Sequence, residues 1–175
     1  MDVSAIARAN MESLRRNAYP GRGIVIGLSP DERSLMQVYW IMGRSENSRN
    51  RVFVRQGEIV RTRAYDESKV QDPSLIIYNC VRVFGRRHIV SNGDQTDTIF
   101  EAFQGGGSFE SALYLRTFEP DAPNFTPRIA GLVDLDDPWH AYELAIIKAF
   151  DGEGRHCTRQ FFRYETPIPG VGHCI

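Results

Sequence analysis

Short apolar stretches separated by turn residues dominate the chain, and helical periodicity is confined to a few places. Residues 23–28 (GIVIGL) and 37–42 (QVYWIM) are apolar and bounded by turn signals. This pattern predicts two strands that pair with each other. Residues 52–55 and 58–63 flank Gln56-Gly57 and predict a hairpin. The first third of the chain is therefore expected to be mostly β-structure.

The most informative stretch is residues 78–97, with the sequence YNCVRVFGRRHIVSNGDQTD. Residues 75–84 are rich in β-branched and aromatic side chains and predict a strand, and residues 88–90 predict its return strand. A helix follows, with Thr96 or Asp94 as its expected cap. This order gathers polar side chains at one end of a strand pair, beside exposed helix N–H groups. Such a place suits an anion or a heterocycle.

The remaining pattern completes an antiparallel α+β fold. It predicts helices at residues 4–16 and 108–117 and strands at 128–135, 141–150 and 157–165. Irregular structure is expected at residues 43–51, 65–74, 118–127 and from 166 onward. Eight to ten strands in local hairpins with two or three helices favour α+β over a doubly wound sheet. We expect one domain, residues 1–175, with residues 1–18 as a peripheral N-terminal helix.

Composition narrows the class of protein. The chain has 42% hydrophobic residues, 25% charged residues and a net charge of −1, which gives no electrostatic footprint for nucleic acid or a membrane surface. No apolar run approaches the ~20 residues of a membrane span, and no signal-peptide core is present. The three cysteines form no CxxC pair, which predicts a reducing cytoplasm. Only Lys69 and Lys148 among 21 basic residues are lysines, so arginine, with its planar donor fork, is the available phosphate ligand.

The sequence lacks the motifs of several kinds of metal and nucleophilic chemistry. The four histidines form no HExxH or HxH pair, so we expect no metal and no cofactor. No GxSxG is present, and the glycines at 105–107 lack phosphate-loop spacing and predict a helix C-cap and linker. Cys80 lies in an apolar strand and is expected to be a buried, inert thiol. What remains is a set of arginines, amides and carboxylates near strand ends, suited to a polar anionic small molecule.

Five segments occur in the order typical of one enzyme family. They are PGRGIVIG (20–27), GRSENSRNR (43–51), YNCVRV (78–83), SNGDQTDTI (91–99) and TPRIAGLV (126–133). Together they resemble the monofunctional, archaeal-type IMP cyclohydrolase family. FEPDAPN before the TPR motif and GHxI near residue 173 make the resemblance closer to a bacterial branch.

The resemblance implies a four-layer αββα sandwich of antiparallel sheets, similar to that of N-terminal nucleophile hydrolases. It also implies a cyclohydrolase that closes 5-formamidoimidazole-4-carboxamide ribonucleotide to IMP with loss of water, in purine biosynthesis. About twenty residues precede the first family strand, so no N-terminal nucleophile is expected. The chain is expected to stop before the family's usual C-terminal end, and a missing tail could hold part of the site.

By motif position, the resemblance implies a set of site residues. Arg22, Arg44 and Arg51, supported by Ser45 and Asn50, would bind phosphate or orient the ring; Tyr78 and Asn79 would contact the reacting edge; Asn92, Thr96 and Asp97 would hold ribose or base; Arg128, with Glu119 and Asp121, would close the far side. Glu119 is the expected proton donor, because a proline-bounded aromatic segment could desolvate it and raise its pKa, and Asp121 is second. Thr96 and Asp97 as mere helix caps, and Arg128 in a structural ion pair, stay open as alternatives.

Two other functions stay open. An amidohydrolase on the same fold would need a processed N-terminal Cys, Ser or Thr, which the sequence does not offer. A non-catalytic purine-nucleotide-binding protein would bind IMP without turnover. In each case the expected partner is a small-molecule purine ribonucleotide, with neither nucleic acid nor membrane, and a homo-oligomer is left open.

Overall fold

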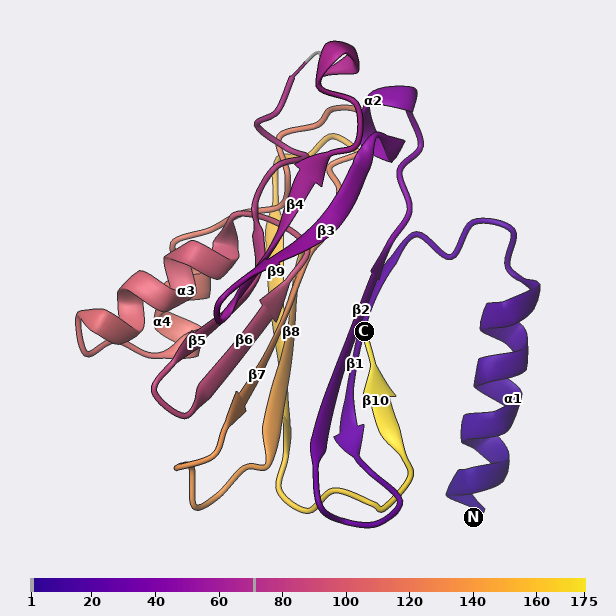
Figure 1. Ribbon diagram of the computed structural model, residues 1–175, viewed down its shortest axis with the longest axis vertical. Helices are drawn as coiled ribbons and strands as arrows, with labels where there is room; N and C mark the ends of the chain where they lie inside the picture. Colours follow the sequence, from indigo (N-terminus) through magenta and orange to yellow (C-terminus); the bar gives the residue numbers. More distant parts are fainter. Residues whose placement is uncertain (1, 71) are drawn as a thin grey trace.

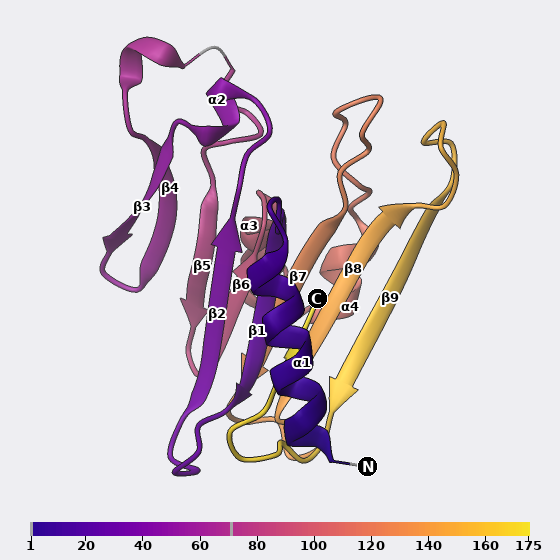
Figure 2. The same ribbon diagram turned by 90° about the vertical axis from the view of Figure 1, so that its right-hand side faces the viewer.

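The strands of the computed structural model, which describes residues 2–70 and 72–175, form two antiparallel sheets (Figures 1 and 2). The smaller sheet has the order β10-β1-β2 and consists of β1 (Arg22–Leu28), β2 (Leu35–Ile41) and β10 (Gly172–Cys174). The larger sheet follows the order of the sequence: β3 (Arg51–Gln56), β4 (Ile59–Ala64), β5 (Asn79–Phe84), β6 (Arg87–Ser91), β7 (Arg128–Asp134), β8 (Tyr142–Ala149) and β9 (Cys157–Tyr164). Neighbours along the chain are thus mostly neighbours in the sheet, as hairpin signals predict.

The helices lie outside the two sheets. They are α1 (Val3–Arg16), α2 (Glu46–Arg49), the 3₁₀ helix η1 (Glu67–Lys69), α3 (Gln95–Gln104) and α4 (Phe109–Tyr114). In Figure 1 the order from left to right is α3 and α4, the larger sheet, the smaller sheet, and α1. The architecture is therefore α+β with two antiparallel sheets between helices.

Two hydrophobic clusters hold these layers together. Ile99 and Leu113 of the helices pack with Ile89 and Leu132 on one face of the larger sheet. On its other face, β1, β6, β7 and β8 enclose a second cluster around Ile26. Because both of its faces are covered, the central strand β7 is buried along nearly its whole length.

A glycine allows the two sheets to approach closely. A Cβ added at Gly131 of β7 would lie 2.7 Å from Cδ1 of Ile26 and 3.1 Å from Cγ1 of Val90. Both contacts are closer than side chains normally permit, so β1 lies directly over β7 only because residue 131 has no side chain.

Most expected elements are confirmed. Residues 23–28 lie within β1, and the strand expected at 37–42 is β2, which begins at Leu35 and ends at Ile41; the two pair with each other, and the hairpin around Gln56-Gly57 is present. The helix at 4–16 is α1, although Asp2, whose Oδ1 accepts from the Ala5 N–H at 3.1 Å, caps it. The irregular segment expected at 118–127 is also found. Residue 71, within the loop expected at 65–74, and Met1 lie outside the described residues.

Four local expectations were wrong. Strand β5 begins at Asn79 rather than Leu75, because the amides of Ile76 and Ile77 turn back to the carbonyl of Pro73. Residues 46–49 form α2, which Ser45 caps. Residues 172–174 form β10, which the Pro/Gly-rich composition concealed. The helix expected at 108–117 is shorter and ends at Tyr114.

One of the two expected caps of α3, Asp94, is found at the N-cap position, and the other is not. Thr96 lies inside the helix, and Asp94 occupies the N-cap position without making a side-chain capping bond. Its carboxylate instead pairs with two arginines, Arg116 and Arg128. A tertiary ion pair has displaced the local capping interaction at this position.

Candidate functional site

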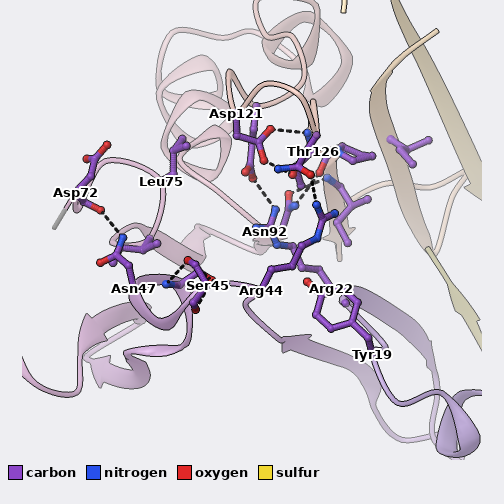
Figure 3. Close-up of a pocket in the computed structure, with 18 of the residues that line it drawn as sticks. Tyr19, Arg22, Arg44, Ser45, Asn47, Asp72, Leu75, Asn92, Asp121 and Thr126 are labelled. Atoms are coloured by element: carbon purple, nitrogen blue, oxygen red, sulfur yellow. Dashed lines mark hydrogen bonds and ion pairs between the residues drawn. The ribbon is translucent and has the colours of Figure 1, made fainter. Parts of the chain in front are cut away.

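A pocket of about 530 Å³ opens where the two sheets meet the loops that follow β2 and α4 (Figure 3). Its wall consists of residues 19–22, the 43–48 segment, residues 72–76 and the irregular 118–127 segment, and β7 and β8 contribute apolar side chains. Pockets of this size and mixed lining typically hold small-molecule ligands. We therefore take this pocket as the candidate active site.

A buried ion pair lies in the pocket. Arg22 is the first residue of β1, and its Nη1 donates to Oε1 of Glu119 at 2.9 Å. The Glu119 side chain is 4% exposed, and its backbone amide is fixed by the carbonyl of Thr126. Burial raises the pKa of Glu119, although Arg22, the nearest cation, opposes the shift. The expectation that its surroundings raise the pKa of Glu119 is confirmed.

Two tyrosine hydroxyls meet beside this pair. Tyr39 of β2 and Tyr78, just before β5, have hydroxyl oxygens 2.7 Å apart. Burial raises the pKa of Tyr78 to about 12 and that of Tyr39 well above its ordinary value. Both phenols therefore stay neutral near pH 7, and one of the two O–H groups is free to donate elsewhere.

Arg51, at the start of β3, differs from Arg22 in its hydrogen bonding. Both terminal nitrogens of its guanidinium are buried, and neither has a hydrogen-bond partner among the described residues. Burial lowers the pKa of Arg51, while Tyr78 and Tyr39 act in the opposite direction. An arginine nevertheless stays charged in a protein. The group thus contains a buried cation without a hydrogen-bonded anion, which suits it to receive an anionic ligand atom.

Arg51 lies in a smaller cavity next to the main pocket. This cavity has a volume of about 310 Å³ and is lined by Met42, Gly43 and Arg49, besides Arg51. Ser48 lines both cavities. The two cavities therefore adjoin each other at Ser48.

The rim joins two loops. Arg44 Nη1 donates to Oδ1 of Asn124 and so connects the 43–48 segment to the 118–127 segment. Asp121 accepts from the backbone N–H of Thr126 at 2.7 Å and also from the Thr126 hydroxyl, which braces the second segment. In Figure 3, Arg22 and Arg44 extend toward the region where Asp121 and Thr126 lie. Ser45 lines the pocket too, but its hydroxyl accepts from the Ser48 N–H at 3.1 Å and caps α2.

Two expected site residues hold a helix instead. Asn79 Nδ2 donates to both oxygens of Asp97 at 3.0 and 3.1 Å, and Arg82 donates to Asp97 at 2.8 Å. These contacts tie β5 to the first turn of α3, and neither Asn79 nor Asp97 lines the pocket. Their placement favours a structural role.

Arg128 also lies outside the pocket lining. Its Nη1 donates to Asp94 Oδ1 at 2.6 Å and to Gln95 Oε1 at 2.7 Å, and its Nε donates to the carbonyl of Thr117 at 2.9 Å. The ion pair expected under the structural alternative for Arg128 is thus present. This cluster anchors the start of α3 against β7 and the end of α4.

The side chains of three further expected site residues already form hydrogen bonds within the protein. Asn92 lines the pocket, but its amide binds the Pro127 carbonyl at 2.9 Å and the Ile129 N–H at 2.8 Å. The Thr96 hydroxyl lies 2.5 Å from that of Ser91 inside the core. Asn50 is buried and holds the backbone of Asp66 through two hydrogen bonds, away from the pocket lining.

Sequence analysis missed Tyr39, Asn124 and Thr126. Tyr39 occupies an inward position of β2, which strand alternation alone could have identified. Thr126 and Asn124 fall inside motifs that were recognised, but their roles depend on contacts across the loop. Only the folded chain brings those partners together.

Two further features concern nucleophilic and metal chemistry: the state of Cys80 and the grouping of potential metal ligands. Cys80 is buried, and burial raises its pKa to about 11, which confirms the expected inert thiol. Among residues 2–70 and 72–175, no three His, Cys, Asp or Glu side chains are grouped so as to hold a metal ion. A reaction without metal stays a prediction. No helix in the described part of the chain has the length and apolar character of a membrane span.

Comparison with known proteins places the chain in a family. It is 34% identical over 120 residues to the IMP cyclohydrolase of Methanothrix thermoacetophila, covering 66% of this chain and 57% of that protein. For the IMP cyclohydrolase of Methanopyrus kandleri the identity is 30% over 146 residues, covering 78% and 72% of the two chains. The enzyme of Methanococcus maripaludis is 32% identical over 129 residues, covering 71% and 62%. The family model described as IMP cyclohydrolase-like protein matches residues 19–168, and the chain therefore belongs to the IMP cyclohydrolase-like family.

Proposed function

We propose that this chain is an IMP cyclohydrolase that closes 5-formamidoimidazole-4-carboxamide ribonucleotide to IMP with loss of water. Membership of the family supports this proposal. The observation that carries it is the buried Glu119–Arg22 pair in a ligand-sized pocket, with the unpartnered Arg51 guanidinium nearby. Together they provide a proton carrier in the pocket and a buried cation in the adjoining cavity.

The reaction needs little more than these groups. The carboxamide nitrogen attacks the formyl carbon of the same molecule, so a C–N bond forms and the formyl oxygen becomes an oxyanion. Two protons, one from each reacting nitrogen, then leave with that oxygen as water. Because both reacting groups are on one imidazole ring, the enzyme has to hold the reactive rotamer and stabilise charge.

We assign the charge stabilisation to Arg51 and Arg22. A buried guanidinium whose nitrogens lack partners gains most from an oxyanion that forms within its reach. Glu119 accepts the proton of the attacking nitrogen and returns a proton to the leaving oxygen. A pKa raised by burial brings this carboxyl closer to neutral pH, where it can act in both directions. Tyr78, held by Tyr39, donates a hydrogen bond at the same end.

The rim is assigned to the rest of the nucleotide. Arg44 and Ser45 lie at the mouth of the pocket, where the ribose phosphate would remain near solvent. Asp121 shapes the 118–127 segment and does not itself transfer a proton. Asn50, Asn79, Asn92, Thr96, Asp97 and Arg128 support the walls.

We further propose the N-terminal-nucleophile-hydrolase type of αββα sandwich, the bacterial branch of the family and a cytoplasmic location.

An ultraviolet assay tests the function directly. Purified protein mixed with the formamido ribonucleotide should form IMP, and a strong chelator should leave the rate unchanged. Tight IMP binding with no turnover would overturn the proposal in favour of a non-catalytic binding protein. The amidohydrolase alternative requires an N-terminal Cys, Ser or Thr, and β1 contains none of these residues. Intact-mass measurement that revealed processing to such a residue would favour it.

A further inference from the structure

The N-terminal helix has an apolar stripe that its own chain leaves uncovered. α1 has 14 residues and buries none of them. Val3, Ile6 and Met11 are 40%, 43% and 49% exposed and lie on one side of the helix, where they flank the partly covered Ala7 and Leu14. Isolated helices of this length are marginal in water. The helix therefore gains stability from any surface that covers this stripe.

The smaller sheet has an uncovered apolar face of its own. In β2 the side chains of Leu35 and Tyr39 pack into the core between the sheets, so by alternation Met36, Val38 and Trp40 lie on the outer side. Met36 is 53% exposed and Val38 is 50% exposed. Large side chains on a sheet face normally pack against another layer.

The helix of the same chain does not provide that layer. Figures 1 and 2 place α1 on the outer side of the smaller sheet, yet both apolar surfaces remain about half exposed. The part of the chain that matches the family begins at residue 19, after the end of α1. The helix thus precedes the part of the chain that matches the family. Neither the segment that follows it nor the smaller sheet beside it covers its apolar stripe completely.

We propose that the surface is completed by a second copy of this chain, with α1 of each copy packed against the outer face of the partner's smaller sheet. The arrangement is a two-fold dimer in which each copy supplies one helix and one sheet face.

The available area supports this occupant. A 14-residue helix is ~21 Å long, and a seven-residue strand spans ~23 Å. Reciprocal packing covers a helix face and a sheet face on each copy, on the order of 800 Å² per partner, which is the size of a standard specific interface. A single contact between two helices alone would bury much less.

Light scattering after size-exclusion chromatography tests the dimer. The full chain should have twice the monomer mass of 19.9 kDa. Ile6→Lys on the helix and Val38→Glu on the sheet should each shift the protein to monomer, because each places a charge in the interface. Leu115→Lys is the matched control, since Leu115 is 78% exposed at the end of α4, and it should remain a dimer. A wild-type monomer at all concentrations would overturn the proposal.

Mixing the two variants tests the exchange of helices. In a mixed pair, one half of the interface is wild type and the other brings the two opposite charges together. Heterodimers should therefore form when the Ile6→Lys and Val38→Glu variants are combined, although each alone is monomeric. If the mixture remains monomeric while circular dichroism shows both variants folded, α1 does not pack on the partner's sheet.

Discussion

Two polar clusters of this chain each contain a buried arginine and a carboxylate but differ in how completely their groups are paired. In the cluster around Arg128, two of the three guanidinium nitrogens form hydrogen bonds. Nη1 donates to Asp94 and Gln95, and Nε donates to the carbonyl of Thr117. In the cluster around Glu119, one arginine forms an ion pair while Arg51 leaves two buried nitrogens without a partner. Arg128 lies outside the pocket lining, whereas Arg22 and Glu119 line the pocket and Arg51 lines the smaller cavity next to it.

The difference indicates where function resides. Burying a polar group without a hydrogen-bond partner lowers the stability of the folded chain. A cluster with a purely structural role is therefore expected to have its polar groups paired. A satisfied cluster fixes the start of α3, whereas an unsatisfied one is prepared for a ligand that completes it. The following predictions test whether this contrast separates structure from catalysis.

The largest expected effect is on turnover. Glu119→Gln should lower kcat by roughly 10²–10⁴, as loss of a positioned proton carrier does, while IMP binding remains nearly intact. Initial-rate kinetics and calorimetric titration with IMP measure the two quantities. Glu110→Gln is the matched control, because Glu110 pairs with Arg163 on the surface, and it should keep the wild-type rate. A Glu119→Gln variant with wild-type kcat would remove Glu119 from the mechanism and direct attention to Tyr78.

The next effect separates the two buried arginines by stability. Arg128→Met should lower the free energy of unfolding by about 2–3 kcal/mol, because Gln95 and the Thr117 carbonyl lose their donor. Arg51→Met removes a charge with unpaired nitrogens and should leave stability unchanged or raise it. Urea denaturation of both variants gives the comparison.

Activity should follow the opposite order. Arg51→Met should lose most of its turnover although it stays folded, whereas Arg128→Met should keep activity at temperatures where it is folded. If Arg51→Met were the less stable of the two and retained wild-type kcat, unpaired nitrogens would not identify the catalytic cluster in this chain.

Strand pairing was accessible from the sequence where local signals acted alone. Alternation and turn residues predicted β1, β2 and the hairpin around Gln56-Gly57, since each pairs with its neighbour along the chain. β10 was missed because three residues carry too little pattern, and its partner β1 lies far away in sequence. Asp94 was correctly expected at the N-cap of α3, but its side chain makes no capping bond because it pairs with two distant arginines.

The limit of sequence analysis is more pronounced for the candidate site than for the strands. The motifs identified Arg22, Arg44, Glu119 and Asp121, all of which line the pocket. The same motifs supplied Asn79, Asp97 and Arg128, whose side chains are used to hold α3. A sequence motif cannot distinguish a residue that contacts a ligand from one that supports the wall. Whether polar atoms are already paired becomes visible only in the folded chain.

A smaller effect is expected at the tyrosine pair. Tyr39→Phe removes one hydroxyl from the 2.7 Å contact and leaves Tyr78 without its partner. Loss of one hydrogen bond corresponds to about 1 kcal/mol, so kcat should fall about fivefold with little change in KM. Tyr114→Phe, an exposed position on α4, is the matched control. Equal effects of the two substitutions would show that the pair has no part in the reaction.

The smallest effect is a pH dependence of stability that belongs to Glu119. Its pKa in the folded chain is raised above the ordinary value of 4.5, so the native state keeps a proton that the unfolded state has already lost. The free energy of unfolding should therefore fall as pH rises from about 4.5 through the folded pKa, with a slope no steeper than about 1.4 kcal/mol per pH unit for one proton. Glu119→Gln lacks this titration.

The difference between variant and wild type isolates that group from all others. Measured by urea denaturation between pH 4 and 7.5, the stability of Glu119→Gln relative to wild type should increase with pH and then level off. Asp94, in the paired cluster, behaves in the opposite way: its pKa is lowered, so its stabilisation is lost only as pH falls below its ordinary value of 3.8. If the stability of Glu119→Gln relative to wild type fell with pH instead, Glu119 would be held as a fully paired carboxylate, like Asp94, and the contrast between the clusters would then fail at its central residue.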